Sequence, residues 1–174
     1  MDQRRCLLVL RHAQTEEIRP GSRDTERRLT EEGERHAREA GEYLRRLGIT
    51  VDTVLCSSAV RARQTLDLLS LDQPDAGRVE IADRFYNAGT DTLIEAIREL
   101  PGDCEVALLI GHAPGAPGLV HELIDPDGST PEAVAAIESR FPAAGLARLE
   151  FDGDWSQLES CSLLSVWMPG TDVA

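Results

Sequence analysis

The chain has 174 residues, a length that suits one compact domain with a full hydrophobic core. Hydrophobic residues make up 41% of it and charged residues 28%, as in ordinary globular proteins. No stretch approaches the roughly 20 consecutive apolar residues of a membrane-spanning helix, and the apolar run after the basic start is too short for a signal peptide. We therefore expect a single cytoplasmic domain over residues 1–174.

The formal net charge is -13, from 18 basic and 31 acidic residues, which predicts repulsion of polyanions. Neither nucleic acid nor an anionic membrane surface is expected as a partner, and an anionic substrate would need a local basic pocket. Four cysteines are scattered without a C-x-x-C pair, which favours reduced core thiols over disulfide bonds or a zinc site. They are Cys6, Cys56, Cys104 and Cys161.

Apolar runs bounded by charged or polar residues are typical of strands buried in a parallel sheet. Such runs predict strands at residues 6–10, 51–56, 78–82, 106–110, 145–151 and 163–168. Apolar residues with helical spacing predict helices at residues 30–47, from about Ser58 onward, and at 91–100, 115–124 and 130–139. Strands that alternate with helices indicate an α/β fold with a doubly wound, mostly parallel sheet.

The helix at residues 30–47 has the clearest predicted ends. Thr30 suits the N-cap position, acidic residues follow it in the first turn, and Gly48 suits the position after the last turn. The charged segment at residues 16–27 contains one proline and one glycine. This composition predicts a surface loop.

Basic and histidine side chains follow three of the predicted strands, where ligands bind in doubly wound sheets. Arg11 and His12 close the first strand, Arg61 lies in the first turn of the helix after the second, and His112 follows the strand at 106–110. This set suits phosphoryl transfer, in which a neutral imidazole attacks phosphorus and arginines hold the oxygens. The helix N-terminus near Ser58 would add backbone donors.

Four segments with characteristic residues occur in order along the chain. They are Arg11-His12-Ala13, Asp24-x-x-Arg27-x-Leu29-Thr30-x-x-Gly33, Ser58-x-x-Arg61-Ala62-x-Gln64-Thr65 and Gly111-His112-x-Pro114. Together they resemble the histidine phosphatase superfamily, also called the phosphoglycerate mutase-like fold. The short chain and the second segment are similar to the SixA-type phosphohistidine phosphatases.

This resemblance implies a three-layer α/β/α sandwich that needs neither a metal nor an organic cofactor. It implies that His12 is the nucleophile that becomes phosphorylated. Arg11, Arg61 and His112 would form the phosphate pocket, with Arg27 as a further phosphate ligand.

Two positions depart from the family pattern. Arg28 stands where many relatives have proline, either as a basic group at the mouth of the pocket or as a solvated charge. Asn87 falls about where members with a dedicated proton donor have glutamate, and asparagine supplies no proton. Asp83 and Asp91 are nearby substitutes, although exposed loop or helix-cap carboxylates are the simpler interpretation. A missing acid favours a leaving group that departs easily, such as the imidazole of phosphohistidine.

The sequence therefore predicts a phosphatase that forms a phosphohistidine intermediate and acts on phosphohistidine in proteins. The alternatives are a phosphatase for a small phosphoester, a phosphate- or phosphoprotein-binding module without turnover, and a metal site that uses His12 and His112. A mutase is disfavoured by the short chain and by Asn87. We interpret His36 and His121, like the two tryptophans, as surface or packing residues. The oligomeric state stays open.

Overall fold

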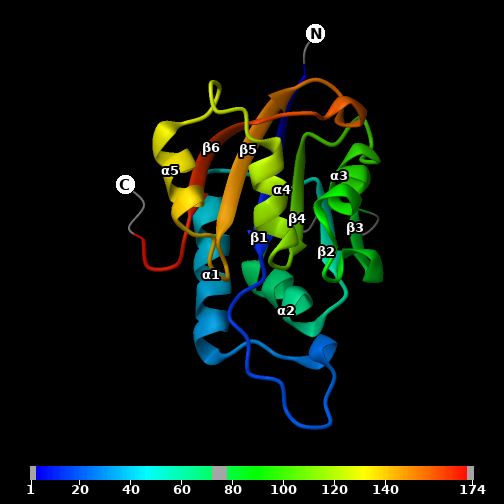
Figure 1. Ribbon diagram of the computed structural model, residues 1–174, viewed down its shortest axis with the longest axis vertical. Helices are drawn as coiled ribbons and strands as arrows, with labels where there is room; N and C mark the ends of the chain where they lie inside the picture. Colours follow the sequence, from blue (N-terminus) through cyan, green and yellow to red (C-terminus); the bar gives the residue numbers. More distant parts are fainter. Residues whose placement is uncertain (1–2, 72–77, 172–174) are drawn as a thin grey trace.

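The computed structural model describes residues 3–71 and 78–171, so residues 1–2, 72–77 and 172–174 of the expected domain lie outside the described residues. Six strands form one sheet in the order β3-β2-β4-β1-β5-β6 (Figure 1). The strands are β1 (Arg4–Arg11), β2 (Thr53–Ser57), β3 (Val79–Ala82), β4 (Val106–Gly111), β5 (Leu146–Asp152) and β6 (Ser162–Trp167). β3, β2, β4 and β1 pair in parallel, whereas β5 runs antiparallel to both β1 and β6. The sheet is thus mixed but mostly parallel.

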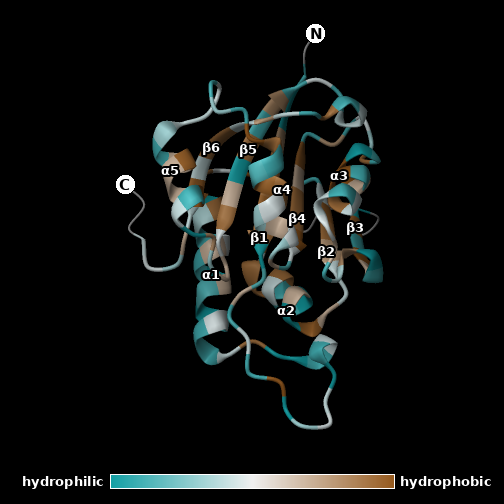
Figure 2. Ribbon diagram, viewed as in Figure 1, coloured by the Kyte–Doolittle hydropathy of each residue, from teal (hydrophilic) through white to brown (hydrophobic). Residues whose placement is uncertain are grey.

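Helices cover both faces of the sheet. They are α1 (Glu31–Arg46), α2 (Val60–Leu69), α3 (Thr90–Arg98), α4 (Gly115–Leu123) and α5 (Pro131–Ser139). Alternate residues of β1 enter two separate cores, because successive side chains of a strand point to opposite faces. Leu7 and Val9 pack in the core under α3, α4 and α5, whereas Leu8 and Leu10 pack in the core under α1 and α2. Figure 2 shows the apolar strands between these helices, and the expected three-layer α/β/α fold is confirmed.

The predicted elements are all present, and their ends lie within two residues of the predicted ones. β1 begins two residues earlier than predicted and includes Arg5, which is charged but only 1% exposed. Its guanidinium donates to the backbone oxygen of Gly102 at 2.6 Å and to that of Cys104. A buried arginine is tolerated here because carbonyl groups satisfy its donors.

The ends of α1 are as predicted. The hydroxyl of Thr30 accepts a hydrogen bond from the backbone N–H of Gly33, at 3.0 Å, and Gly48 adopts a φ of +65° just beyond the helix. Gly41 lies where α1 meets α2, and a Cβ there would lie 2.1 Å from the backbone oxygen of Leu69. The two helices therefore pack at a distance that only glycine permits.

The tryptophans and cysteines have packing roles, as expected. Trp155 is buried and its indole N–H donates to the backbone oxygen of Cys104 at 2.8 Å, while Trp167 stacks on Tyr43 with ring centroids 5.8 Å apart. All four cysteines are buried. Among the described residues, no helix is both long and apolar enough to cross a membrane.

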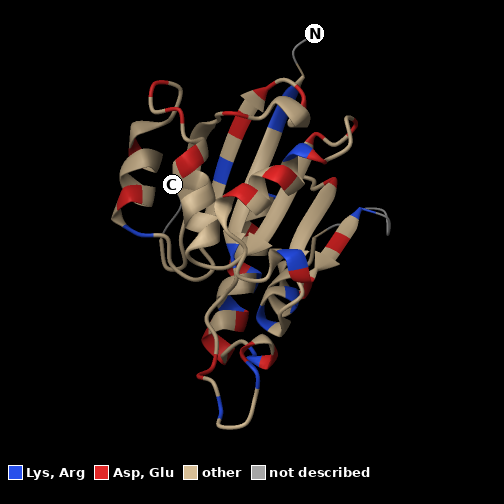
Figure 3. Ribbon diagram, turned by 45° about the vertical axis from the view of Figure 1, so that its right-hand side comes forward, with Lys and Arg blue, Asp and Glu red and all other residues tan. Residues whose placement is uncertain are grey.

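The topology brings the carboxyl ends of β1, β2 and β4 together, because β4 pairs with both of the others. Residues 13–30, here called the β1–α1 segment, extend from this end of the sheet (Figure 1). Acidic and basic residues both occur along this segment, whereas the strands carry mostly uncharged ones (Figure 3). The segment is only partly the surface loop that its composition predicts, because the short 3-10 helix Asp24–Glu26 packs against α2.

Candidate active site

His12 lies directly after β1 and is 9% exposed. Its Nδ1 lies 2.8 Å from the backbone oxygen of Ala13, which can only accept a hydrogen bond, so Nδ1 carries the ring proton. Arg61 Nε donates to His12 Nε2 at 3.3 Å, which requires a lone pair on Nε2. Both contacts therefore assign a neutral ring with its proton on Nδ1 and a lone pair on Nε2.

The chain beyond His12 is held by the helix that carries Arg61. The backbone N–H of Ala13 donates to the hydroxyl of Thr65 at 3.1 Å, and this hydroxyl donates to the backbone oxygen of Arg61 at 2.7 Å. Gln64 accepts a hydrogen bond from the backbone N–H of Leu29 at 2.9 Å. The Gln64-Thr65 pair of the third sequence segment thus fixes both ends of the β1–α1 segment against α2.

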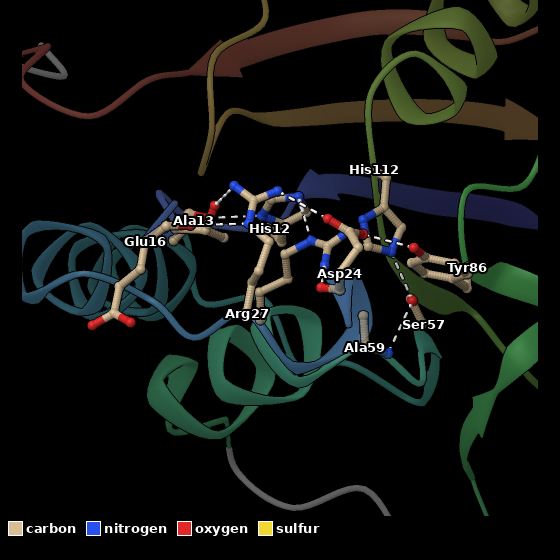
Figure 4. Close-up of polar contacts among 11 residues, drawn as sticks. His12, Ala13, Glu16, Asp24, Arg27, Ser57, Ala59, Tyr86 and His112 are labelled. Atoms are coloured by element: carbon tan, nitrogen blue, oxygen red, sulfur yellow. Dashed lines mark hydrogen bonds and ion pairs between the residues drawn. The ribbon is translucent and has the colours of Figure 1, made fainter. Parts of the chain in front are cut away.

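Arg61 is 3% exposed, and Asp24 holds its guanidinium at two points. Nη1 donates to the backbone oxygen of Asp24 at 2.7 Å, and Nη2 donates to the carboxylate at 2.9 Å. The same carboxylate accepts from the hydroxyl of Tyr86 at 2.6 Å and from Arg27 Nη1 at 3.1 Å (Figure 4). The hydrogen bond from Tyr86, together with those from the arginines, holds the pKa of Asp24 well below its usual range.

Arg27 and Ser58 lie at the edge of this cluster. The guanidinium of Arg27 also donates to the backbone oxygen of Glu16, at 2.9 Å, and to the hydroxyl of Thr15. Arg27 is thus bonded to its own segment, although it lies near enough to His12 to lower the pKa of that ring. Ser58 donates from its hydroxyl to the carboxylate of Asp83.

Two buried nitrogen atoms near His12 have no protein partner. Arg11 Nη1 donates to the backbone oxygen of Phe141 at 3.2 Å, but its Nε is buried without a partner. His112 is 4% exposed, and its Nδ1 is also without a partner. Only four buried side-chain atoms of the described residues share this property. Because unpartnered buried polar atoms are costly, two of them at one site point to a polar ligand.

Both histidines are held in their neutral forms. The rings of His12 and His112 lie 5.0 Å apart between their centroids. Burial, with the positive charge of Arg61 and Arg11 nearby, lowers the pKa of His12 to about 4. Burial, with the neighbouring His12 ring and Arg61, lowers the pKa of His112 to about 3. The sign of these shifts favours unprotonated rings at neutral pH.

The charge of the site suits a phosphoryl group. The positive charges of Arg11, Arg27 and Arg61 all act on His12, and the carboxylate of Asp24 neutralises one of them. The excess of positive charge thus matches a dianion in a protein whose overall charge is -13. Arg28, the other basic departure in this segment, is exposed.

Among the described residues, no hydrogen bond joins a candidate proton donor to His12 or His112, and Asp83 reaches only Ser58 at the edge of the cluster. Asn87 is exposed and has a φ of 48°, a left-handed conformation that asparagine tolerates better than most residues. Asp83 and Asp91 are exposed, as the simpler interpretation expects. Tyr86 reaches the site instead: its ring meets that of His112 edge-on, with centroids 5.5 Å apart. The hydrogen bond to Asp24 raises the pKa of Tyr86, which makes it a poor acid.

The sequence interpretation missed three residues that shape the site: Asp24, Ser57 and Tyr86. Asp24 lies in the second sequence segment, but no role was predicted for it. Tyr86 directly precedes Asn87, the position at which members with a proton donor have glutamate. Ser57 ends β2 and had a signal of its own, because polar residues at the carboxyl ends of parallel strands face the ligand region. A role for each of them depends on contacts between distant parts of the chain.

A hollow of about 570 Å³ lies at the end of the sheet opposite His12, near the start of β1. Carboxylates line much of it, among them Asp125, Glu150, Asp152 and Glu159. This negative lining does not suit an anionic substrate. The cluster around His12 is therefore the better candidate for phosphate chemistry.

Fold and site together define an α/β protein of the histidine phosphatase type, and similarity to known proteins agrees. The family model of the histidine phosphatase superfamily (branch 1) matches residues 7–90. The structure assigned as phosphohistidine phosphatase SixA from Nakamurella multipartitia has a TM-score of 0.84 at 31% identity, over 97% of this chain and 98% of that one. This chain belongs to the histidine phosphatase superfamily.

Other relatives extend the match. A structure assigned as SixA from Agrobacterium tumefaciens has a TM-score of 0.77 at 26% identity, over 97% of this chain and 100% of that chain. An uncharacterized protein of Mycobacterium tuberculosis is 35% identical over 156 residues, which cover 89% of this chain and 96% of the relative. These matches span nearly the whole chain, so the similarity is not limited to the first three sequence segments.

Proposed function

We propose that this protein is a phosphatase in which His12 Nε2 attacks phosphorus and becomes transiently phosphorylated. One observation carries the proposal: His12 Nε2 has a lone pair, and the residues beside it, Arg11 and His112, each have a buried nitrogen without a protein partner. A phosphoryl group on Nε2 would give these nitrogens oxygen atoms as acceptors. Membership in the superfamily supports the same chemistry.

The reaction proceeds in two displacements. In the first, a bond forms between His12 Nε2 and phosphorus while the bond from phosphorus to the substrate imidazole breaks. That imidazole, which already carries a proton on its other nitrogen, takes the electron pair and departs as a neutral ring. In the second, water attacks phosphorus, inorganic phosphate departs and Nε2 regains its lone pair. Arg11, Arg61 and His112 stabilise the charge on the phosphoryl oxygens in both steps.

We propose phosphohistidine in a protein as the substrate. Asp83, Asp91 and Asn87 are exposed, and Tyr86 is bonded to Asp24. A sugar alkoxide would need a proton from such a donor, whereas the imidazole of phosphohistidine can already carry one near neutral pH. The two similar structures assigned as SixA support this choice.

The test is to compare the wild-type protein with His12→Ala on a phosphohistidine protein, p-nitrophenyl phosphate and a set of sugar phosphates, with and without a chelator. His36→Ala is the control, because His36 lies on α1 and takes no part in the cluster. We expect an acid-labile phosphoenzyme in the wild type and in the control but not in His12→Ala, with phosphohistidine turned over fastest and no effect of the chelator.

Other results would change the assignment. Turnover by His12→Ala would refute the nucleophile. Faster turnover of a small phosphoester would replace the substrate. Phosphate binding without a phosphoenzyme would indicate a binding module, and loss of activity with a chelator would indicate the metal site.

A further inference from the structure

His112 lies in contact with a buried serine on the neighbouring strand. Ser57 ends β2 and His112 follows β4, and the register of these parallel strands, with Cys56 opposite Ile110, brings the two residues together. His112 Nε2 and Ser57 Oγ are 2.7 Å apart. Ser57 has no exposed surface, so water does not compete for its hydroxyl. Figure 4 shows the His112 ring with Ser57 on one side and His12 and Asp24 on another.

The partners of Ser57 decide which atom donates in this pair. Its oxygen already accepts a hydrogen bond from the backbone N–H of Ala59 at 3.3 Å, so its single proton still needs an acceptor. His112 Nε2 is the acceptor within reach. If Nε2 donated instead, the serine proton would have no acceptor among the described residues, at the cost of a buried unpaired donor.

We infer that Ser57 is a positioning residue that holds His112 in the tautomer with its proton on Nδ1. In a neutral imidazole one nitrogen donates and the other accepts, so donation from Ser57 to Nε2 leaves Nδ1 as the donor. Nδ1 is the buried nitrogen that has no protein partner. The inference rests on the proposed function, in which Nδ1–H meets a phosphoryl oxygen.

The opposite tautomer would oppose the reaction. It would direct a lone pair of Nδ1 at the negatively charged oxygens of the substrate. Protonation of the whole ring would avoid this, but burial and the neighbouring His12 and Arg61 lower the pKa of His112 to about 3. Because the ring stays neutral at working pH, the choice of tautomer decides whether it donates or repels.

The direct test is a long-range ¹H–¹⁵N spectrum of the wild-type protein at pH 7, which distinguishes the two neutral tautomers of each histidine. His112→Gln identifies the His112 signals by their disappearance. We expect the pattern of a ring protonated on Nδ1. A ring protonated on Nε2 would overturn the inference, whether or not the protein is a phosphatase, because the measurement does not depend on turnover.

Kinetics of variants give a second test. Loss of one neutral hydrogen bond corresponds to about a fivefold effect, so Ser57→Ala is expected to lower kcat about fivefold with a smaller change in KM. Its His112 spectrum should shift toward the Nε2-protonated form. Ser57→Thr keeps the hydroxyl and should restore both readouts. Ser160→Ala is the control, since Ser160 is exposed at the opposite end of the sheet.

The two readouts separate the possible failures. An unchanged kcat and an unchanged tautomer in folded Ser57→Ala would overturn the positioning role. Loss of phosphatase activity in that variant with no change of tautomer would also overturn it, because the loss would then be structural. A wild-type protein with the expected tautomer but no phosphoenzyme would refute the proposed function and leave the tautomer assignment intact.

Discussion

Replacement of Asp24 by asparagine separates two roles that its position allows. The carboxylate lies against Arg61 Nη2 at 2.9 Å and against Arg27 Nη1 at 3.1 Å. In one role it orients Arg61 so that the remaining N–H groups face the phosphoryl oxygens. In the other it competes with the phosphoryl group for the same guanidinium.

The size of the effect follows from the bonds that change. Asparagine leaves the backbone contact from Arg61 Nη1 in place and can accept one neutral hydrogen bond, but it loses the charge of the contacts to Arg61 and Arg27. Hydrogen bonds to charged groups contribute about 1.5–3 kcal/mol and neutral ones about 1 kcal/mol. The Asp24 side chain is 35% exposed, so solvent screens part of the difference. A loss of about 2 kcal/mol lowers kcat/KM about thirtyfold.

The assay is steady-state turnover of a phosphohistidine protein by the wild type, Asp24→Asn and Glu26→Gln. Glu26 is a matched control, because it lies in the same segment and its carboxylate contacts the exposed Arg23. We expect Glu26→Gln to resemble the wild type. Unchanged or faster turnover by Asp24→Asn, with a lower KM, would refute the orienting role and support competition.

Three further predictions concern pH, a contact of the site and packing. In the proposed mechanism only neutral His12 attacks phosphorus, so an NMR titration should show a neutral His12 ring from pH 8 to 5 that titrates near pH 4; titration near 6.5 would contradict the lowered pKa. Tyr86→Phe keeps the ring but removes the hydrogen bond to Asp24 and should lower kcat/KM about tenfold, and an unchanged value would exclude a role for that bond. Gly41→Ala should reduce the free energy of unfolding by about 2 kcal/mol in denaturant titrations, because the added Cβ clashes with α2. Gly102→Ala is the control, since a Cβ at that position meets no atom within 4 Å and should have little effect. Equal stabilities of the two variants would show that the helices move apart freely.

The sequence predicted the order of strands and helices and the positions of His12, Arg11, Arg61 and His112. These features are local. Apolar runs and helical spacing depend on neighbouring residues, and a polar residue after a buried strand lies at the ligand-binding edge of the sheet wherever the strand pairs. The charged Arg5 shows the limit, since its place inside β1 depends on carbonyl groups about a hundred residues away.

Only the tertiary structure decided how the site is held. Asp24 meets Arg61 across 37 residues, and Ser57 meets His112 across 55 residues. Neither contact has a sequence period that would reveal it, because each depends on which strands pair and in which register. The sequence by itself therefore determined which side chains reach the edge of the sheet. The packing of α2 and the pairing of β2 with β4 decided which atoms of those side chains are hydrogen-bonded within the protein and which are free for a ligand.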